Sequence, residues 1–314
     1  MKIVLLSLLF VITLWADAHI FVYHRFGDSR HPSTDTTKQE LIKEFQYFKD
    51  FGYKVIPLEK LVNAIKNKEI IQDNWIVLTI DDNFKSFYNN GLEIFKKFNY
   101  PFSLFVYVKA TEKKYPDYLT WQQLKEISKY GSLEFHSYAH PHLTNMSDKS
   151  IKHDFSKGLK IFMKNLHVIP KYYTYPYGEY DKRVEKIAKS FGFDAIINQN
   201  MGAVGQKSDL FDLDRSALVG KTNLKYLLKF KYLDASWIEP LVYPKSGVLK
   251  SIHVETKERA FGALIYVSKY GWQKAKVNDG NIDKTVNLKL LKKRNRVIIS
   301  INDKISTKLL MKDK

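Results

Sequence analysis

The sequence predicts an α/β fold of parallel strands joined by helices, followed by a smaller β-rich part. From residue 19 to about residue 230, short apolar runs alternate with amphipathic stretches of helical period, which is the pattern of strands connected by crossover helices. Polar residues repeatedly stand where an apolar run ends. After Trp237 the helical stretches largely disappear and alternating strands replace them, which is typical of a β-rich unit.

The first eighteen residues differ in composition from the rest of the chain. Lys2 gives a positive start, and residues 3–15 form an apolar run. Ala16-Asp17-Ala18 then has the small-x-small pattern of a cleavage site, as in a secretory signal peptide. The apolar run is shorter than the roughly 20 residues that cross a bilayer. We therefore expect residues 1–18 to be removed, and the mature protein to be periplasmic or associated with the cell envelope without stable membrane insertion.

Capping signals predict where the helices of the α/β part begin. Thr37 and Glu40 have the spacing of a capping box, and apolar residues at helical spacing follow until Gly52. Residues 84–98 also have a helical period. Thr120 starts a further helix that Gly131 closes.

Apolar runs predict the strands, and three of these runs end in polar residues. The predicted strands cover residues 53–56, 75–80, 102–108, 133–135, 172–175 and 195–197. Asp81-Asp82 follows the second of them, His136 the fourth, and Pro176-Tyr177-Gly178 the fifth. In a parallel α/β barrel the loops after the strands converge on one face. We therefore expect these distant polar residues to meet there.

Composition restricts the chemistry of this predicted site. The chain contains no cysteine, which excludes disulfides, thiolate metal sites and cysteine nucleophiles. Its net charge of +18 comes from lysines spread along the whole sequence. We find no nucleic-acid-binding signature, so we predict no nucleic-acid partner. Any metal must be held by histidines and carboxylates.

Four polar residues have the chemistry of a metal-assisted hydrolase. Two imidazoles and one carboxylate, with positions left open for water, are a common catalytic arrangement for a divalent metal. His136 and His140 have a suitable spacing, and Asp82 can supply the carboxylate. Asp81 then remains free to accept a proton as a general base. Each motif alone also has a structural explanation, namely a helix cap, a chance histidine pair or a turn.

These residues carry a resemblance to a known family. Residues 78–82 (Leu-Thr-Ile-Asp-Asp), 136–141 (His-Ser-Tyr-Ala-His-Pro) and 175–178 (Tyr-Pro-Tyr-Gly) resemble three motifs of the NodB-type polysaccharide deacetylases, carbohydrate esterase family 4. The resemblance extends from about residue 20 to residue 220. It is closest to the subgroup that acts on poly-N-acetylglucosamine. It implies a distorted (β/α)7-type, TIM-like barrel over residues 19–232, with residues 233–314 as a small β-rich accessory domain.

The resemblance also implies a role for each motif residue. Asp82, His136 and His140 would hold a divalent metal, zinc in most of the family, and Asp81 would be the base that activates a metal-bound water. The backbone N–H of Tyr177 would stabilise the oxyanion. The implied reaction removes N-acetyl groups from an N-acetylglucosamine-containing polysaccharide, either peptidoglycan or an exopolysaccharide.

Three positions depart from the family pattern. Asn83 replaces a glycine, and asparagine tolerates the left-handed backbone that the glycine allows. Thr174 replaces an arginine that normally orients the base. The late Leu-x-His motif that supplies the general acid has no clear match; His24, after the first strand, is our candidate for that acid, and the alternative is a core or supporting histidine. Arg215 either reaches the site or pairs with a neighbouring carboxylate.

Two questions stay open from the sequence. The departures leave a non-catalytic glycan-binding protein on a degenerate deacetylase barrel as the alternative function, and a bound metal would argue against it. The β-rich part contains aromatic residues that form either a sugar-stacking face or a core: Trp237, Tyr243, Tyr266, Tyr270 and Trp272.

Overall fold

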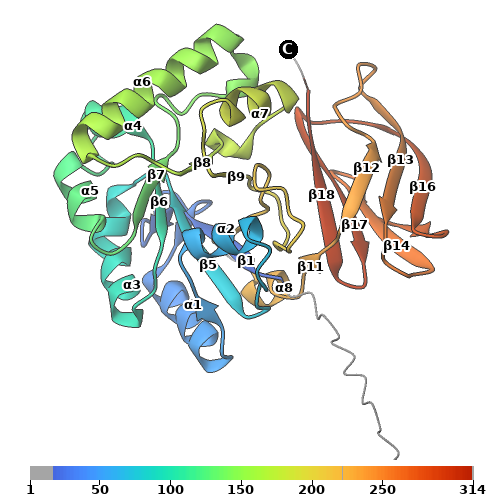
Figure 1. The fold of residues 1–314 in the computed structure, drawn as a ribbon, viewed down its shortest axis with the longest axis horizontal. Helices are drawn as coiled ribbons and strands as arrows, with labels where there is room; N and C mark the ends of the chain where they lie inside the picture. Colours follow the sequence, from blue (N-terminus) through green and yellow to red (C-terminus); the bar gives the residue numbers. More distant parts are fainter. Residues whose placement is uncertain (1–16, 221, 313–314) are drawn as a thin grey trace, which may run out of the picture.

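The computed structural model describes residues 17–220 and 222–312. These residues form a curled α/β part and a β-rich part that lie side by side (Figure 1). The predicted signal segment lies outside the described residues except for Asp17 and Ala18. Among the residues described, no helix has the length and apolar character needed to cross a membrane.

The α/β part is built on one parallel sheet of eight strands, in the order β10-β1-β5-β6-β7-β8-β9, with β4 paired to β5. A parallel pair, β2 (Arg25–Phe26) and β3 (Asp35–Thr36), lies outside it. The eight strands are β1 (His19–Tyr23), β4 (Lys54–Val55), β5 (Trp75–Asp81), β6 (Ser103–Val106), β7 (Ser132–Phe135), β8 (Tyr172–Thr174), β9 (Ala195–Ile197) and β10 (Ser216–Ala217). The curled sheet with its surrounding helices confirms the predicted barrel-like α/β class.

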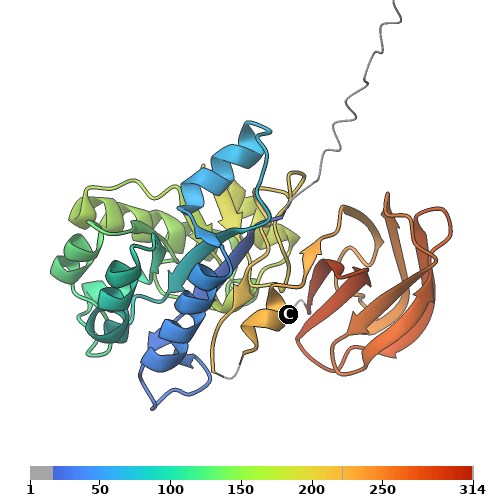
Figure 2. The same ribbon diagram turned by 90° about the horizontal axis from the view of Figure 1, so that it is seen from below.

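Helices surround the curled sheet, as Figures 1 and 2 show from two directions. The helices are α1 (Lys38–Asp50), α2 (Leu58–Lys66), α3 (Leu92–Phe98), α4 (Val108–Glu112), α5 (Trp121–Ile127), α6 (Asp148–Leu166), α7 (Lys182–Lys189) and α8 (Leu224–Leu227). Three short helical segments are η1 (Phe87–Gly91), η2 (Leu143–Asn145) and η3 (Pro176–Gly178).

The capping signals in the sequence are realised in the structure. Thr37 and Glu40 form a reciprocal capping box at the start of α1, and Thr120 forms another with Gln123 at the start of α5. The predicted helix at 84–98 differs, because it begins with the π-helical turn η1 before α3. The strand predicted at 102–108 is also shorter, because Val108 already begins α4.

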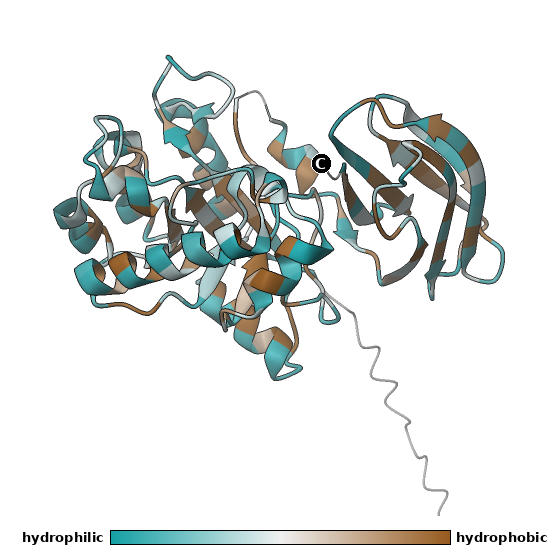
Figure 3. Cartoon of the chain, turned by 90° about the horizontal axis from the view of Figure 1, so that it is seen from above, coloured by the Kyte–Doolittle hydropathy of each residue, from teal (hydrophilic) through white to brown (hydrophobic). Residues whose placement is uncertain are grey.

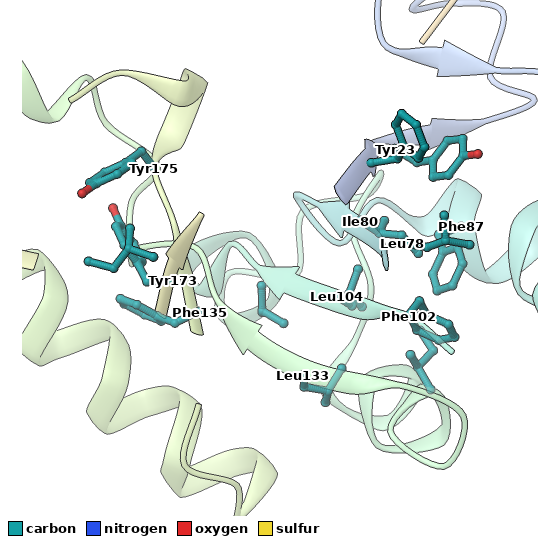
Figure 4. Packing of buried hydrophobic residues seen from close by; sticks show 14 of the residues in the cluster. Tyr23, Leu78, Ile80, Phe87, Phe102, Leu104, Leu133, Phe135, Tyr173 and Tyr175 are labelled. Carbon is teal, nitrogen blue, oxygen red and sulfur yellow. The ribbon is translucent and has the colours of Figure 1, made fainter. Parts of the chain in front are cut away.

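Both faces of the parallel sheet are covered, so its strands are apolar on both sides. In β5, Ile76, Leu78 and Ile80 belong to an aromatic-rich core under the helices, part of which is shown in Figure 4. Trp75 and Val77 face a second core on the other side, which α2 helps to close. Because side chains alternate along a strand, Asp81 shares the face of Trp75 and Val77.

The β-rich part consists of two sheets with a shared core, and their strands pair antiparallel except for the parallel pair β11–β18. Hydropathy colouring shows polar and apolar residues alternating along these strands (Figure 3), as expected when one face is buried. One sheet has the order β11-β18-β17-β14-β15, and the other β12-β13-β16. The strands are β11 (Lys231–Tyr232), β12 (Ala235–Glu239), β13 (Val248–Thr256), β14 (Gly262–Val267), β15 (Gly271–Lys276), β16 (Asn281–Lys289), β17 (Arg294–Ile301) and β18 (Lys304–Met311). β11 precedes the predicted boundary at residue 233, yet it already pairs with β18.

The first described residues are tied into the fold. Ala18 is fully buried, and its backbone exchanges two hydrogen bonds with Val204, of 2.9 and 2.8 Å. The Asp17 carboxylate accepts a hydrogen bond of 3.0 Å from the N–H of Tyr232 in β11. The segment before β1 therefore joins the start of the barrel to the start of the β-rich part.

Candidate active site

The candidate site lies where the parallel strands end. The register pairs Tyr23 with Ile80, and Val106 with Phe135. The carboxyl ends of β1, β5, β6 and β7 are therefore level with one another. The residues that follow these ends project from one edge of the sheet, as expected for a barrel.

Three side chains converge as a candidate metal site. One ligand atom each from Asp82, His136 and His140 lies within 4.8 Å of the others. The Asp82 Oδ1 atom is 3.1 Å from His140 Nε2 and 3.4 Å from His136 Nε2, yet it is a buried atom without a hydrogen-bond partner among the described residues. Two imidazole nitrogens and a carboxylate oxygen that converge without hydrogen-bond geometry suit a divalent cation between them.

The orientation of His136 supports this assignment. Its Nδ1 atom lies 2.9 Å from the carbonyl oxygen of Thr174 and 2.6 Å from the Thr174 hydroxyl. An Nδ1–H that donates to the carbonyl leaves the lone pair of Nε2 free, which is how metal-binding histidines are usually fixed. Thr174, which replaces the family arginine, therefore orients one of the candidate ligands.

The loop that carries both histidines is held by a buried carboxylate. Asp154 of α6 accepts hydrogen bonds of 2.9 Å from the N–H of Tyr138 and 2.8 Å from that of Ala139. Ser137 and His140 have positive φ angles of 69° and 51°, a backbone that non-glycine residues adopt only when their surroundings enforce it. The sequence contained no signal for Asp154, which lies in the middle of a long helix.

Asn83 replaces the family glycine without loss of the turn. Its φ angle of 44° is left-handed, as predicted. Its side chain accepts a hydrogen bond of 2.7 Å from Tyr107 N–H and donates one of 2.9 Å to the Thr111 hydroxyl. The asparagine therefore ties the loop after β5 to the loop after β6, which a glycine cannot do.

Asp81 is buried against the guanidinium of Arg215. Its two carboxylate oxygens accept hydrogen bonds of 2.8 and 2.7 Å from the guanidinium of Arg215, which is 1% exposed. Arg215 also donates to the Asn198 carbonyl and the Thr79 hydroxyl. Burial alone would raise the pKa of Asp81, but Arg215 and His136 outweigh it and lower that pKa. From the sequence, we expect Arg215 either to reach the site or to pair with a carboxylate. It does both, because the carboxylate with which it pairs belongs to the candidate site.

Asp82 is also held in its charged form. Burial opposes ionisation, but the imidazoles of His136 and His140 keep the pKa of Asp82 well below its ordinary value. Both adjacent aspartates are therefore carboxylates, one facing the arginine and one facing the histidines.

His24 lies beside these groups. Burial lowers the pKa of its imidazole, an effect that the nearby charges of Asp81 and Asp82 oppose. The His24 Nδ1 atom is buried and has no hydrogen-bond partner among the described residues. Buried polar atoms are normally hydrogen-bonded, and Nδ1 of the buried His19 shares this lack of a partner in the described part of the chain. What distinguishes His24 is its place beside Asp81 and Asp82.

The turn after β8 brings Tyr177 to the same edge. Tyr177 has φ 59° and ψ 6°, and the hydrogen bonds that close its turn use the N–H groups of Gly178 and Glu179. The Tyr177 ring is half exposed, stacks on His142 at 4.1 Å and meets the edge of His140 at 4.5 Å. The turn therefore contacts one of the candidate ligands directly.

The β-rich part supports this turn. The sequence predicted the turn but not this support. Arg294, the first residue of β17, donates a hydrogen bond to the carbonyl oxygen of Tyr177. Arg296 donates one of 2.9 Å to the carbonyl of Gln199, whose side chain packs against Gly178. Arg294 and Tyr177 are 117 residues apart, and no local pattern could have related them.

Comparison with known proteins identifies the family. Residues 69–196 match the sequence model of the polysaccharide deacetylase family, and this range contains Asp81, Asp82, both histidines and Tyr177. The chain contains a polysaccharide deacetylase domain. Proteins of this family are hydrolytic metalloenzymes that remove N-acetyl groups, and the chain is an enzyme of this class.

Individual relatives of the deacetylase domain are distant. The putative polysaccharide deacetylase YxkH of Bacillus subtilis is 22% identical over 62% of this chain and 69% of its own length. A poly-beta-1,6-N-acetyl-D-glucosamine N-deacetylase of Staphylococcus aureus is 22% identical over 67% of this chain and 76% of its own length. The deacetylase PplD of Streptococcus pyogenes, solved in complex with acetate, has the same fold, with a TM-score of 0.63 and 23% identity over 68% of this chain and 98% of PplD.

Proposed function

We propose that the chain is an exported, metal-dependent N-deacetylase that acts on an N-acetylglucosamine-containing polysaccharide, either peptidoglycan or an exopolysaccharide. The observation that carries this proposal is that two adjacent aspartates have different neighbours. Asp82 faces two histidines whose free nitrogens converge on it, while Arg215 holds Asp81 apart from that cluster. A degenerate barrel that only binds glycans needs neither arrangement.

The donor set fits a divalent metal, and we propose zinc. Imidazole nitrogens and a carboxylate are the ligands that zinc takes in catalytic sites without cysteine. When bound, the metal would polarise the acetamide carbonyl and lower the pKa of a water molecule beside it.

The protein side chains would then move the protons. Asp81 accepts a proton from the attacking water; each of its oxygens still has a free lone pair besides the one facing Arg215. The N–H of Tyr177 donates to the oxyanion that forms on the acetamide carbon. When the carbon–nitrogen bond breaks, the leaving nitrogen takes a proton from the imidazolium form of His24. The lowered pKa of His24 makes this form a stronger acid and also a less populated one at neutral pH. The products are acetate and a free amine on the sugar.

The proposal predicts that Asp81→Asn abolishes acetate release from N-acetylglucosamine oligomers while leaving the metal bound. An amide cannot accept the proton of the attacking water, whereas the ligand cluster of Asp82, His136 and His140 is unchanged. We expect the turnover number to fall by at least about a thousandfold. Acetate release and zinc content would be measured on the same purified protein.

Two results would contradict parts of the proposal. Full activity of Asp81→Asn would exclude Asp81 as the base. A wild-type chain that binds N-acetylglucosamine oligomers but holds no metal would favour the non-catalytic glycan-binding function. His136→Ala is the matched control, because it should lose metal and activity together. Acetate release from peptidoglycan and from poly-N-acetylglucosamine, measured side by side, identifies the polymer.

A further inference from the structure

A groove lies between the barrel and the five-stranded sheet, next to the candidate active site. Its volume is about 510 Å³. The barrel side is formed by the loop after β9, by β10 and by α8, and the other side by β14, β15 and β17 of the β-rich part. The lining residues are Gln199, Met201, Ser216, Ala217, Tyr226, Leu227, Tyr266, Ser268, Trp272, Arg294, Arg296 and Ile298.

The sheet side of the groove is a row of side chains on one face. Ile298 of β17 pairs with Tyr266 of β14, and Tyr266 pairs with Trp272 of β15. Their neighbours along the strands, such as Val297 and Ile265, face the core of the β-rich part, so this row faces away from that core. The row ends at Trp272, which is 42% exposed.

The barrel side also presents an aromatic ring. Tyr226 of α8 is 46% exposed, and its ring meets only the edge of Phe230 at 4.9 Å among the described aromatic residues. Exposed aromatic faces with polar groups beside them are characteristic of ligand grooves. The flat apolar face of a pyranose ring stacks on such rings, while its hydroxyl and acetamide groups form hydrogen bonds with side chains such as Gln199, Ser268 and Arg296.

Two lining residues of the groove contact the turn that carries Tyr177. Arg294 lines the groove and donates to the carbonyl of Tyr177. Gln199 also lines it, and its side chain packs against Gly178 of the same turn. These two contacts place the groove beside that turn, so a polymer whose acetamide lies at the candidate metal site would pass the turn to reach Trp272.

We propose that this groove is a remote subsite that binds further sugar units of the same N-acetylated hexosamine chain, with Trp272 and Tyr226 as stacking platforms. This inference rests on the proposed function for the identity of the polymer. It assigns a binding role to the β-rich part, and it makes affinity increase with chain length.

The charge of the lining selects the acetylated form of the chain. Two arginines line the groove, and none of its described lining residues is acidic. A free amine on a deacetylated sugar is a cation, and no carboxylate in the lining is available to pair with it. Arg294 and Arg296 repel such an amine but can donate hydrogen bonds to an acetamide carbonyl. Unreacted polymer is therefore held more tightly than product.

The test compares binding of an N-acetylglucosamine hexamer and dimer, in β-1,4 and β-1,6 linkages, to the full-length mature protein by calorimetry. Trp272→Ala should weaken hexamer binding by about tenfold, the value of one good stacking contact, and should affect the dimer less. Phe261→Ala is the matched control: Phe261 is an aromatic residue of the same part, 99% exposed, and it lies outside this groove. Trp272→Phe should restore most of the affinity.

The outcomes separate the groove from the catalytic proposal. Equal hexamer affinities for Trp272→Ala and Phe261→Ala, in a protein that releases acetate, would overturn the subsite and leave the function standing. If a metal-loaded protein binds the hexamer in a Trp272-dependent way but releases no acetate, the proposed function would be overturned and the subsite would stand. Binding of heparin in place of the hexamer, lost in Trp272→Ala, would assign the groove to an anionic polymer and overturn the proposal.

The charge argument has its own measurement. The fully deacetylated hexamer should bind more weakly than the acetylated one, and the difference should shrink at high salt because salt screens the arginine charges. Equal affinities at low salt would overturn the role of the two arginines in selecting the acetylated chain.

Discussion

The buried guanidinium of Arg215 keeps Asp81, the proposed base, in its ionised form. Asp81 is 3% exposed, and a carboxylate so deeply buried would otherwise be protonated and useless as a base. Arg215 meets both of its oxygens and is itself anchored by the Asn198 carbonyl and the Thr79 hydroxyl. The arginine missing at position 174 is thus replaced from a different strand, β10, one residue before its start.

At the same scale, the role of His24 can be isolated through the leaving group. His24→Ala should lower amide hydrolysis by about a hundredfold or more, the usual contribution of a general acid, with metal retained. The same variant should hydrolyse 4-nitrophenyl acetate nearly as well as the wild type, because a nitrophenolate leaves without a proton. Asp81→Asn is the control that should lose both reactions. Equal loss of amide and ester hydrolysis in His24→Ala would make His24 a supporting residue.

At the scale of the element, a partly buried hydrogen bond attaches helix α1 to strand β1. The Tyr23 hydroxyl donates to the Glu44 carboxylate at 2.7 Å. Burial raises the pKa of Glu44 from 4.5 to about 7. The folded protein therefore binds a proton at the Glu44 carboxyl group more tightly than the unfolded chain does. The stabilisation from that bound proton is lost as pH rises through the pKa of Glu44 in the folded protein.

We predict that the wild type loses stability relative to Glu44→Gln as pH rises from 4.5 to 7. The loss should be about 2 kcal/mol, somewhat less than the full linkage value because the side chain keeps some contact with solvent. Urea unfolding across this range measures it. Glu93→Gln, in an exposed ion pair with Lys96, is the control and should change little. A constant difference between wild type and Glu44→Gln would contradict the buried-proton argument.

The strand ends explain how much of the site could be predicted from sequence. Asp81, Asp82, His136 and Tyr177 each follow or end an apolar run, and parallel topology alone brings such positions together. The partners that orient them were not predictable in this way. Arg215 lies 134 residues from Asp81, and Thr174 lies 38 residues from His136. These pairings depend on tertiary packing, which leaves no periodic trace in the chain.

At the scale of the whole molecule, the residues before β1 belong to the folded body. Asp17 and Ala18 contact the barrel at Val204 and the β-rich part at Tyr232. Removal of residues 1–18 would delete three hydrogen bonds, although it would leave the site intact. We therefore propose that export cleavage occurs before Asp17, and that the small-x-small pattern overstates the length of the removed segment by two residues.

This placement predicts a mature chain that begins at or before Asp17. Intact mass measurement of the exported protein checks it, and a mature chain that begins at His19 would contradict it. A recombinant chain starting at His19 should be less stable than one starting at Asp17 by about 2 kcal/mol, since each buried hydrogen bond contributes about 1 kcal/mol and the new terminus is partly solvated. Urea unfolding of the two chains gives the difference.

The hydrogen bond from Arg294 to Tyr177 also bears on the order in which parts of the site are synthesised. A polypeptide emerges from its amino terminus, so all of the candidate metal ligands are synthesised well before β17. A partly made chain can therefore gather its histidines and aspartates around an ion, while the turn that carries Tyr177 still lacks the arginine that holds its carbonyl. If the proposed function holds, metal binding needs only residues that precede β17, whereas the turn of Tyr177 is complete only once β17 has packed against it.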